Sequence, residues 1–169
     1  MTPVRPRSAA RRTLLGALVV APVAAALSRT GDAFAQAAPL PEVHVYKSPT
    51  CGCCKDWIKH LEASGFKVKF TDVPDSRFYR ARFGMPAKFG SCHTAIVGGY
   101  VVEGHVPAAD IKKLLREKPQ ALGIAVPGMP VGSPGMDGPE YKGEVDPYDV
   151  LLVQADGRWR VYTSYEGKK

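Results

Sequence analysis

Apolar and polar residues alternate over residues 42–46, which predicts a β-strand. Ser-Pro-Thr at 48–50 interrupts this pattern and offers hydroxyl groups that can cap a helix, so residues 51–63 are predicted to be helical. The apolar residues of that helix share one side: Trp57, Ile58 and Leu61. Residues 66–73 alternate again and predict a second strand. A strand–helix–strand unit of this kind predicts that the two strands are parallel.

The middle of the chain predicts a short helix followed by a hairpin. Pro-Asp-Ser at 74–76 begins the helix, and Gly-Met-Pro at 84–86 ends it. Residues 94–97 are then predicted to form a strand, and Gly98-Gly99 is a strong signal for a tight turn. Residues 100–103 form the returning strand.

Pro107 is predicted to begin a further helix, which ends before Pro119. The resulting order, with a cysteine pair opening the first helix, matches the thioredoxin-like arrangement. We therefore predict an α/β, thioredoxin-like fold with a mixed four-stranded sheet flanked by helices. A C-terminal loop rich in Gly, Pro and Met at 127–136 follows. Residues 148–154 and 159–164 predict a second hairpin, an appendage of the same domain.

The first residues have the features of an export signal. Arginines without acidic residues precede an apolar run of 14 residues, from Leu14 to Leu27, and small residues suited to cleavage follow it. Residues 10–15 resemble a twin-arginine signal, although an ordinary secretory signal stays open. We predict that residues 1–37 are a cleaved export signal and that residues 38–169 form a single metal-binding domain.

Removing the predicted signal changes the charge of the chain. The whole sequence has 23 Lys and Arg against 16 Asp and Glu, but residues 38–169 have 18 against 15. No basic stripe with interleaved aromatic residues occurs in this part, which predicts no nucleic-acid partner. No apolar run there reaches the roughly 18 residues that span a bilayer, so we expect no stable membrane insertion after the signal is removed.

The four cysteines carry the candidate chemistry. Cys51, Cys53 and Cys54 lie within one predicted helix turn, where free N–H groups favour thiolates. Cys92 is far away in the sequence, in the loop before the third strand. In a thioredoxin-like fold that loop lies against the start of the first helix, so we expect all four sulfurs in one pocket. The position where many such proteins have a proline holds Cys-His-Thr at 92–94, which favours a metal site over general disulfide exchange.

The donor types favour cuprous copper. Sites made of sulfur alone select Cu(I), zinc or iron–sulfur clusters, and three ligands on one helix turn suit bridged Cu(I) better than a single tetrahedral zinc ion. The thioethers of Met129 and Met136 also suit Cu(I), and His60, His93 and His105 can add nitrogen ligands. The eight candidate metal ligands are Cys51, Cys53, Cys54, Cys92, His93, His105, Met129 and Met136.

Other interpretations of the cysteines stay open. The four thiols can form two disulfides, and Cys54 can be a plain core residue of the first helix. Cys51 and Cys54 also have the spacing of a thiol–disulfide oxidoreductase, in which Cys51 attacks a substrate and Cys54 resolves the mixed disulfide. They are the catalytic residues only if the pair is redox-active.

Four segments together closely resemble the CopG-type copper-resistance proteins, a family first catalogued as a domain of unknown function. These segments are Cys-Gly-Cys-Cys-Lys-Asp-Trp (51–57), Ser-Cys-His-Thr (91–94), Glu-Gly-His-Val-Pro (103–107) and Val-Pro-Gly-Met-Pro-Val-Gly-Ser-Pro-Gly-Met (126–136). The resemblance covers nearly all of residues 42–154.

The resemblance implies a thioredoxin-like protein of the Gram-negative periplasm that binds a cysteine-bridged copper cluster and takes part in copper redox chemistry. The cysteines of the family carry over onto Cys51, Cys53, Cys54 and Cys92. Its histidines and methionines carry over onto four further residues: His93, His105, Met129 and Met136. We therefore expect a copper-binding protein that confers resistance by sequestering Cu(I) or changing its oxidation state. Its expected partners are copper ions and other periplasmic copper-handling proteins, and a role in metal insertion into a partner is a third hypothesis.

Overall fold

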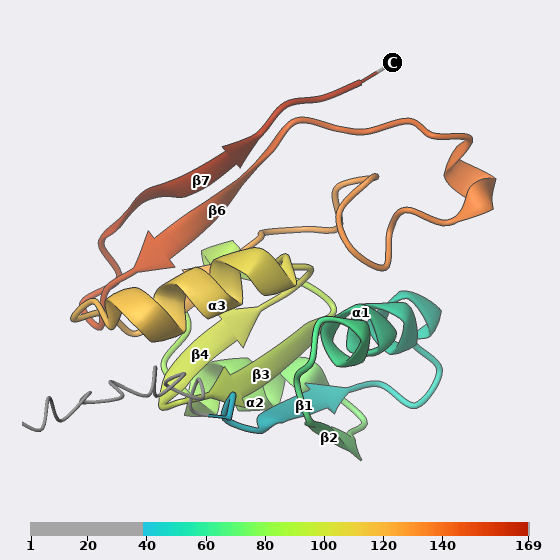
Figure 1. The fold of residues 1–169 in the computed structure, drawn as a ribbon. Coiled ribbons are helices and arrows are strands. Elements are labelled where there is room, and N and C mark those ends of the chain that lie inside the picture. The colour runs from blue at the N-terminus through green and yellow to red at the C-terminus, as the bar shows by residue number, and fades with distance from the viewer. Residues whose placement is uncertain (1–38, 169) are drawn as a thin grey trace, which may run out of the picture. The chain divides into compact units, whose positions relative to one another are not determined.

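The computed structural model describes residues 39–168 (Figure 1). The predicted export signal, residues 1–37, lies outside the described residues. Residues 39–168 contain three α-helices: α1 (Gly52–Ala63), α2 (Ser76–Arg82) and α3 (Ala108–Glu117). The strands are β1 (Val43–Lys47), β2 (Val68–Asp72), β3 (His93–Val97), β4 (Tyr100–Glu103), β5 (Gly123–Ala125), β6 (Tyr148–Val153) and β7 (Trp159–Tyr165). Two short 3₁₀ helices complete the order: η1 (Ala87–Phe89) and η2 (Pro139–Tyr141). Within the described part, the helices are all too short or too polar to cross a membrane.

The strands form one mixed sheet in the order β2-β1-β3-β4-β5-β6-β7. β1 pairs with β2 in parallel, as the strand–helix–strand pattern predicts, and β4 pairs with β5 in parallel, while the other pairs are antiparallel. The mixed α/β class with flanking helices is therefore confirmed, but the expectation of four strands is wrong, because the sheet has seven.

The extra strands have a specific origin. β5 has only three residues, too few to show alternation, so the sequence pattern does not reveal it. The predicted second hairpin is present as β6 and β7, but it is part of the sheet because β6 pairs with β5 along Gly123–Ala125. The C-terminal hairpin thereby extends the sheet and is not an appendage.

The alternation of β1 divides its side chains between the two faces of the sheet. Val43 and Val45 are buried in the main core together with the apolar sides of α1 and α3. His44 and Tyr46 point to the opposite face, where the ring of Tyr46 stacks on Tyr79 of α2 at a centroid distance of 4.1 Å. Helices α1 and α3 thus cover one face, and α2 lies against the other (Figure 1).

Candidate metal centre

The first three cysteines are held by the opening turn of α1. Cys51 is the N-cap, and its Sγ accepts a hydrogen bond from the backbone N–H of Cys54 at 3.3 Å. Cys54 is buried together with Trp57 on the inner side of the helix, whereas Cys51 and Cys53 are partly exposed. Cys51 and Cys54 are joined in a disulfide, and Cys53 and Cys92 are free.

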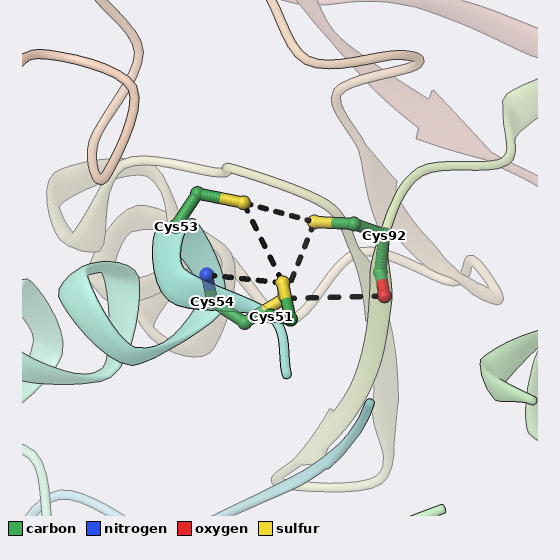
Figure 2. A group of neighbouring side chains, drawn as sticks. All are labelled: Cys51, Cys53, Cys54 and Cys92. Carbon is green, nitrogen blue, oxygen red and sulfur yellow. Dashed lines mark hydrogen bonds between the residues drawn. A yellow bond between two sulfur atoms is a disulfide. The ribbon is translucent and has the colours of Figure 1, made fainter. Parts of the chain in front are cut away.

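The fourth cysteine lies beside these three (Figure 2). The Sγ atom of Cys92 is 3.4 Å from Sγ of Cys54 and 3.9 Å from Sγ of Cys53. The Sγ atom of Cys53 is in turn 3.5 Å from Sγ of Cys51. The expectation that a loop nearly 40 residues away brings its thiol to the start of the first helix is therefore confirmed.

Two histidines, His93 and His105, also contact the sulfur of Cys92. The Nε2 atom of His105 is 3.0 Å from the Cys92 sulfur, and Nδ1 of His93 is 3.2 Å from it. The other nitrogen of His105, Nδ1, donates to the carbonyl oxygen of Pro134 at 2.8 Å. Since a carbonyl only accepts, this bond places the proton of a neutral His105 ring on Nδ1 and leaves the Nε2 lone pair facing the sulfur. Cys92 thus belongs to two donor groups: the four cysteines, and Cys92 with His93 and His105.

His93 is fully buried and packs against Trp57, with ring centroids 4.3 Å apart. The indole N–H of Trp57 donates to the carbonyl oxygen of Val106 at 2.8 Å, which holds the aromatic wall in place. Of the buried side-chain nitrogen and oxygen atoms in the described residues, Nε2 of His93 lacks a hydrogen-bond partner. An unsatisfied buried polar atom is costly, and a bound water or ion is one of the ways in which proteins satisfy such an atom.

Burial determines the protonation of this centre. It holds the pKa of His93 well below its usual value, with a smaller contribution from neighbouring His105, and it also lowers the pKa of His105. Both rings are therefore neutral near pH 7 and can donate a lone pair. Burial, followed by the adjacent Cys53 sulfur, raises the pKa of Cys92 to about 12. This thiol keeps its proton until a cation displaces it, so metal binding here releases protons.

The loop of residues 126–136 closes over the start of α1. Gly135 has a φ of +83°, and a Cβ atom there would lie 2.5 Å from the carbonyl oxygen of Cys53, so only glycine permits this approach. Met136 is buried, and its sulfur accepts a hydrogen bond from the hydroxyl of Tyr141 at 3.6 Å. Met129 is 51% exposed. The described contacts place neither thioether directly against the cysteine sulfurs.

His60, which the sequence offered as a further nitrogen donor, has a different environment. Its Nε2 accepts the backbone N–H of Ala108, the first residue of α3, at 3.0 Å. This contact joins α1 to α3 and occupies one of the two ring nitrogens of His60.

We expect the metal-free protein to lose stability as the pH falls from about 7.5 to about 5.5. The ordinary histidine pKa is 6.5, and burial lowers the pKa of His60, His93 and His105 in the folded state. The unfolded chain then binds more protons than the folded chain, so the free energy of unfolding decreases by at most about 1.4 kcal/mol per pH unit for each buried histidine, and by less for half-buried His60. Burial raises the pKa of Glu103, which acts in the opposite direction but is one group against three. Urea unfolding at both pH values measures this effect, and a higher midpoint at the lower pH would contradict it.

Comparison with known proteins agrees with the chemistry of the site. A family model described as "Protein of unknown function, DUF411" matches residues 89–136, which include Cys92, His93, His105 and the Gly/Pro/Met loop. No curated protein matches the chain. A solved structure named "Copper resistance protein copG- Form 1" is 48% identical, with a TM-score of 0.70, and the match covers 76% of this chain and 99% of that one. The corresponding "Form 2" is also 48% identical, with a TM-score of 0.69 and coverage of 75% and 99%. With a soft-donor cluster and this identity over nearly the whole of the solved chains, the protein belongs to the CopG-type family of copper resistance proteins.

Proposed function

We propose that this chain is a periplasmic copper-binding protein that holds Cu(I) as cargo through clustered cysteine thiolates. In this proposal residues 1–37 are a removed export signal and residues 38–169 are one thioredoxin-like metal-binding domain. The observation that carries it is the approach of Cys92 to within 3.4 Å of Cys54, which joins two distant segments in one cluster of four sulfurs. The similarity to solved copper resistance proteins supports an extracytoplasmic role.

The donor set supports cuprous copper as the cargo. Thiolates are soft ligands that select Cu(I) over hard cations, and a thiolate can bridge two ions. Cys51, Cys53 and Cys92 are partly exposed, so ions can reach the sulfurs from solvent. Copper resistance then results from holding Cu(I) away from other ligands or from changing its oxidation state.

His93 and His105 complete the proposed ligand set. Their neutral rings face the Cys92 sulfur, so an ion bound to that sulfur has imidazole nitrogens beside it. The Gly/Pro/Met loop contacts both α1 and His105, and we propose that it acts as a lid. Exposed Met129 receives incoming Cu(I) on its thioether, and Met136 contributes its sulfur when the lid rearranges.

The disulfide makes copper capacity depend on redox state. Two of the four sulfurs are bonded to each other, so Cys51 and Cys54 cannot act as thiolates until the bond is reduced. A dithiol reductant supplies two electrons and two protons, becomes a disulfide itself, and leaves two free thiols on α1.

We expect the reduced protein to bind more Cu(I), and to bind it more tightly, than the protein with the Cys51–Cys54 disulfide intact. The measurement is anaerobic Cu(I) titration against a colorimetric chelator, combined with metal analysis of the purified protein. We expect the reduced form to hold Cu(I) at least about ten-fold more tightly, since metal sites that lose supporting groups weaken by this much or more. Retention of zinc with no measurable Cu(I) site would refute the proposal.

The disulfide also supports a second candidate function, thiol–disulfide exchange with other exported proteins. Cys51 caps α1 and is partly exposed, which suits an attacking cysteine, and buried Cys54 suits a resolving cysteine. Insulin reduction that survives both C53S and C92S, and that persists in a strong copper chelator, would favour this function over copper binding. Transfer of bound copper to a second exported protein in a mixing assay would favour a role in metal insertion.

A further inference from the structure

The segment that carries Cys92 has no regular secondary structure. Gly90, Ser91 and Cys92 lie between η1 and β3 and are all partly exposed. A loop of this kind has little intrinsic order, yet the Cys92 sulfur must stay within bonding range of α1 and of two histidines. Contacts from other parts of the chain must therefore hold residues 90–92 in place.

Gly128 bonds Gly90 and the Ser91 hydroxyl from the side of the Gly/Pro/Met loop, and a buried carboxylate bonds the chain on both sides of the Cys92–His93 pair. Glu103, the last residue of β4, is fully buried. Its Oε1 accepts the backbone N–H of Ser91 at 2.8 Å, and its Oε2 accepts the hydroxyl of Thr94 at 2.6 Å. The residues before and after the Cys92–His93 pair are thus bonded to the same carboxylate.

A buried arginine, Arg80, bonds both this carboxylate and the loop that carries Cys92. Arg80 of α2 donates from Nε to Oε1 of Glu103 at 2.7 Å and from Nη2 to the carbonyl oxygen of Ser91 at 2.5 Å. Gly90 permits this approach, since a Cβ atom there would lie 2.7 Å from Nη1 of Arg80. Both backbone groups of Ser91 are therefore held by the Arg80–Glu103 ion pair.

The main chain around Glu103 connects this pair to the histidines. Gly104, the next residue, donates its N–H to the carbonyl oxygen of His93 at 3.0 Å, and His105 follows directly. The carbonyl oxygen of Glu103 accepts the N–H of Val126 at 3.0 Å, at the start of the Gly/Pro/Met loop. The segments that carry Cys92 and His93, and the start of the Gly/Pro/Met loop, are therefore hydrogen-bonded to Glu103 or to Gly104.

We propose that the Arg80–Glu103 ion pair is a positioning device for the metal centre, which holds the thiol of Cys92 and the ring of His93 in register with the cysteines of α1. This inference rests on the proposed copper function. A buried ion pair contributes little net stability compared with apolar residues, because desolvation offsets the attraction. Its physical effect lies in the directed bonds that it makes to the loop that carries Cys92, and neither residue belongs to either group of candidate donors.

The first test needs no copper. In a chain with C51S and C54S, the remaining thiols of Cys53 and Cys92 are 3.9 Å apart, close enough for a short bifunctional reagent such as dibromobimane to join them. R80K keeps the positive charge but loses the planar fork that bonds Glu103 and Ser91 together. We expect R80K to slow the cross-linking several-fold.

The second test measures copper. In the chain with all four cysteines, R80K is expected to weaken Cu(I) binding by about ten-fold in a chelator competition, as is typical when a supporting partner of a metal ligand is removed. The matched control is D110N. Asp110 is also a buried carboxylate, and it accepts the hydroxyls of Thr163 and Tyr165, both at 2.6 Å, between α3 and β7. We expect D110N to lower the free energy of unfolding and to change neither cross-linking nor copper affinity.

The outcomes separate this inference from the proposed function. Suppose that wild type binds Cu(I), and that R80K changes neither the cross-linking rate nor the Cu(I) affinity. The positioning role is then wrong and the copper function stands. If wild type does not bind Cu(I) but R80K still slows cross-linking, the copper function fails and the positioning of Cys92 remains. If D110N and R80K reduce the cross-linking rate and the Cu(I) affinity equally, the effect is a general loss of stability, which would overturn the inference. If R80K does not fold, T94V decides by the same two readouts, since it removes only the bond to Oε2 of Glu103.

Discussion

Replacing Cys92 with serine is expected to weaken Cu(I) binding more than any other single cysteine substitution. Cys92 is the one residue shared by the two donor groups, the four cysteines and the set of Cys92, His93 and His105. C92S therefore removes a sulfur from both groups and leaves a hydroxyl, a hard donor that Cu(I) does not favour. Removing even an outer partner of a metal ligand costs 10- to 100-fold in affinity, so loss of this direct ligand should cost at least about 100-fold.

The matched control for this prediction is C53S. Cys53 is also a free and partly exposed cysteine, but it belongs only to the group of four cysteines. With C53S, the Cys92–His93–His105 group stays intact, so a smaller loss of affinity is expected. Chelator competition on the reduced proteins measures the Cu(I) dissociation constants of C92S and C53S. A loss in C92S equal to or smaller than that in C53S would show that Cys92 does not connect the two groups.

Replacing Gly123 with alanine is expected to give the largest loss of stability among single substitutions at glycine. Gly123 begins β5 and pairs in parallel with Val101 of β4. A Cβ atom on Gly123 would lie 1.8 Å from the carbonyl oxygen of Val101 and 2.7 Å from its carbonyl carbon. Because these atoms belong to the backbone of a buried strand, they cannot move aside as a side chain can. The two strands must separate, so we expect G123A to cost about 3 kcal/mol or more of the free energy of unfolding.

Urea unfolding of the copper-free protein measures this loss, and G52A is the control. Gly52 opens α1, and a Cβ atom there would meet nothing within 4 Å. Alanine is the better helix former, so G52A is expected to leave the free energy of unfolding unchanged or raise it by up to about 1 kcal/mol. A G123A protein with the unfolding midpoint of wild type would show that β4 and β5 are not packed as closely as the structure has them.

The position of Gly123 also explains why the strand count could not be predicted. The apolar run from Gly123 to Val126 is too short to distinguish a strand from a loop, and a glycine weakens the signal further. The strand exists because β4 on one side and β6 on the other supply hydrogen-bonding partners. Those partners lie about 20 and 30 residues away along the chain, so local pattern carries no information about them.

Some features of the metal centre follow from the sequence alone. Three cysteines on one helix turn and a Cys-His pair before the third strand predicted the convergence of four sulfurs, but only together with the expectation of a thioredoxin-like arrangement. Helix periodicity and strand alternation are local properties, and they fix which side chains face the core and where the first turn of α1 begins. The prediction that the ligand is copper follows from donor type, which is also a property of the residues themselves.

Other features depend on tertiary structure. Which histidine nitrogen faces Cys92 depends on the relative positions of β3 and the turn after β4, whereas the Cys51–Cys54 disulfide joins residues only three positions apart at the start of α1. The roles of Arg80 and Glu103 are of the same kind, since 23 residues separate them and a charged pair in a sequence does not reveal that it is buried. Patterns of three to four residues determine local structure, whereas contacts between distant segments form only when the whole core packs, and the finer geometry of this site consists of such contacts.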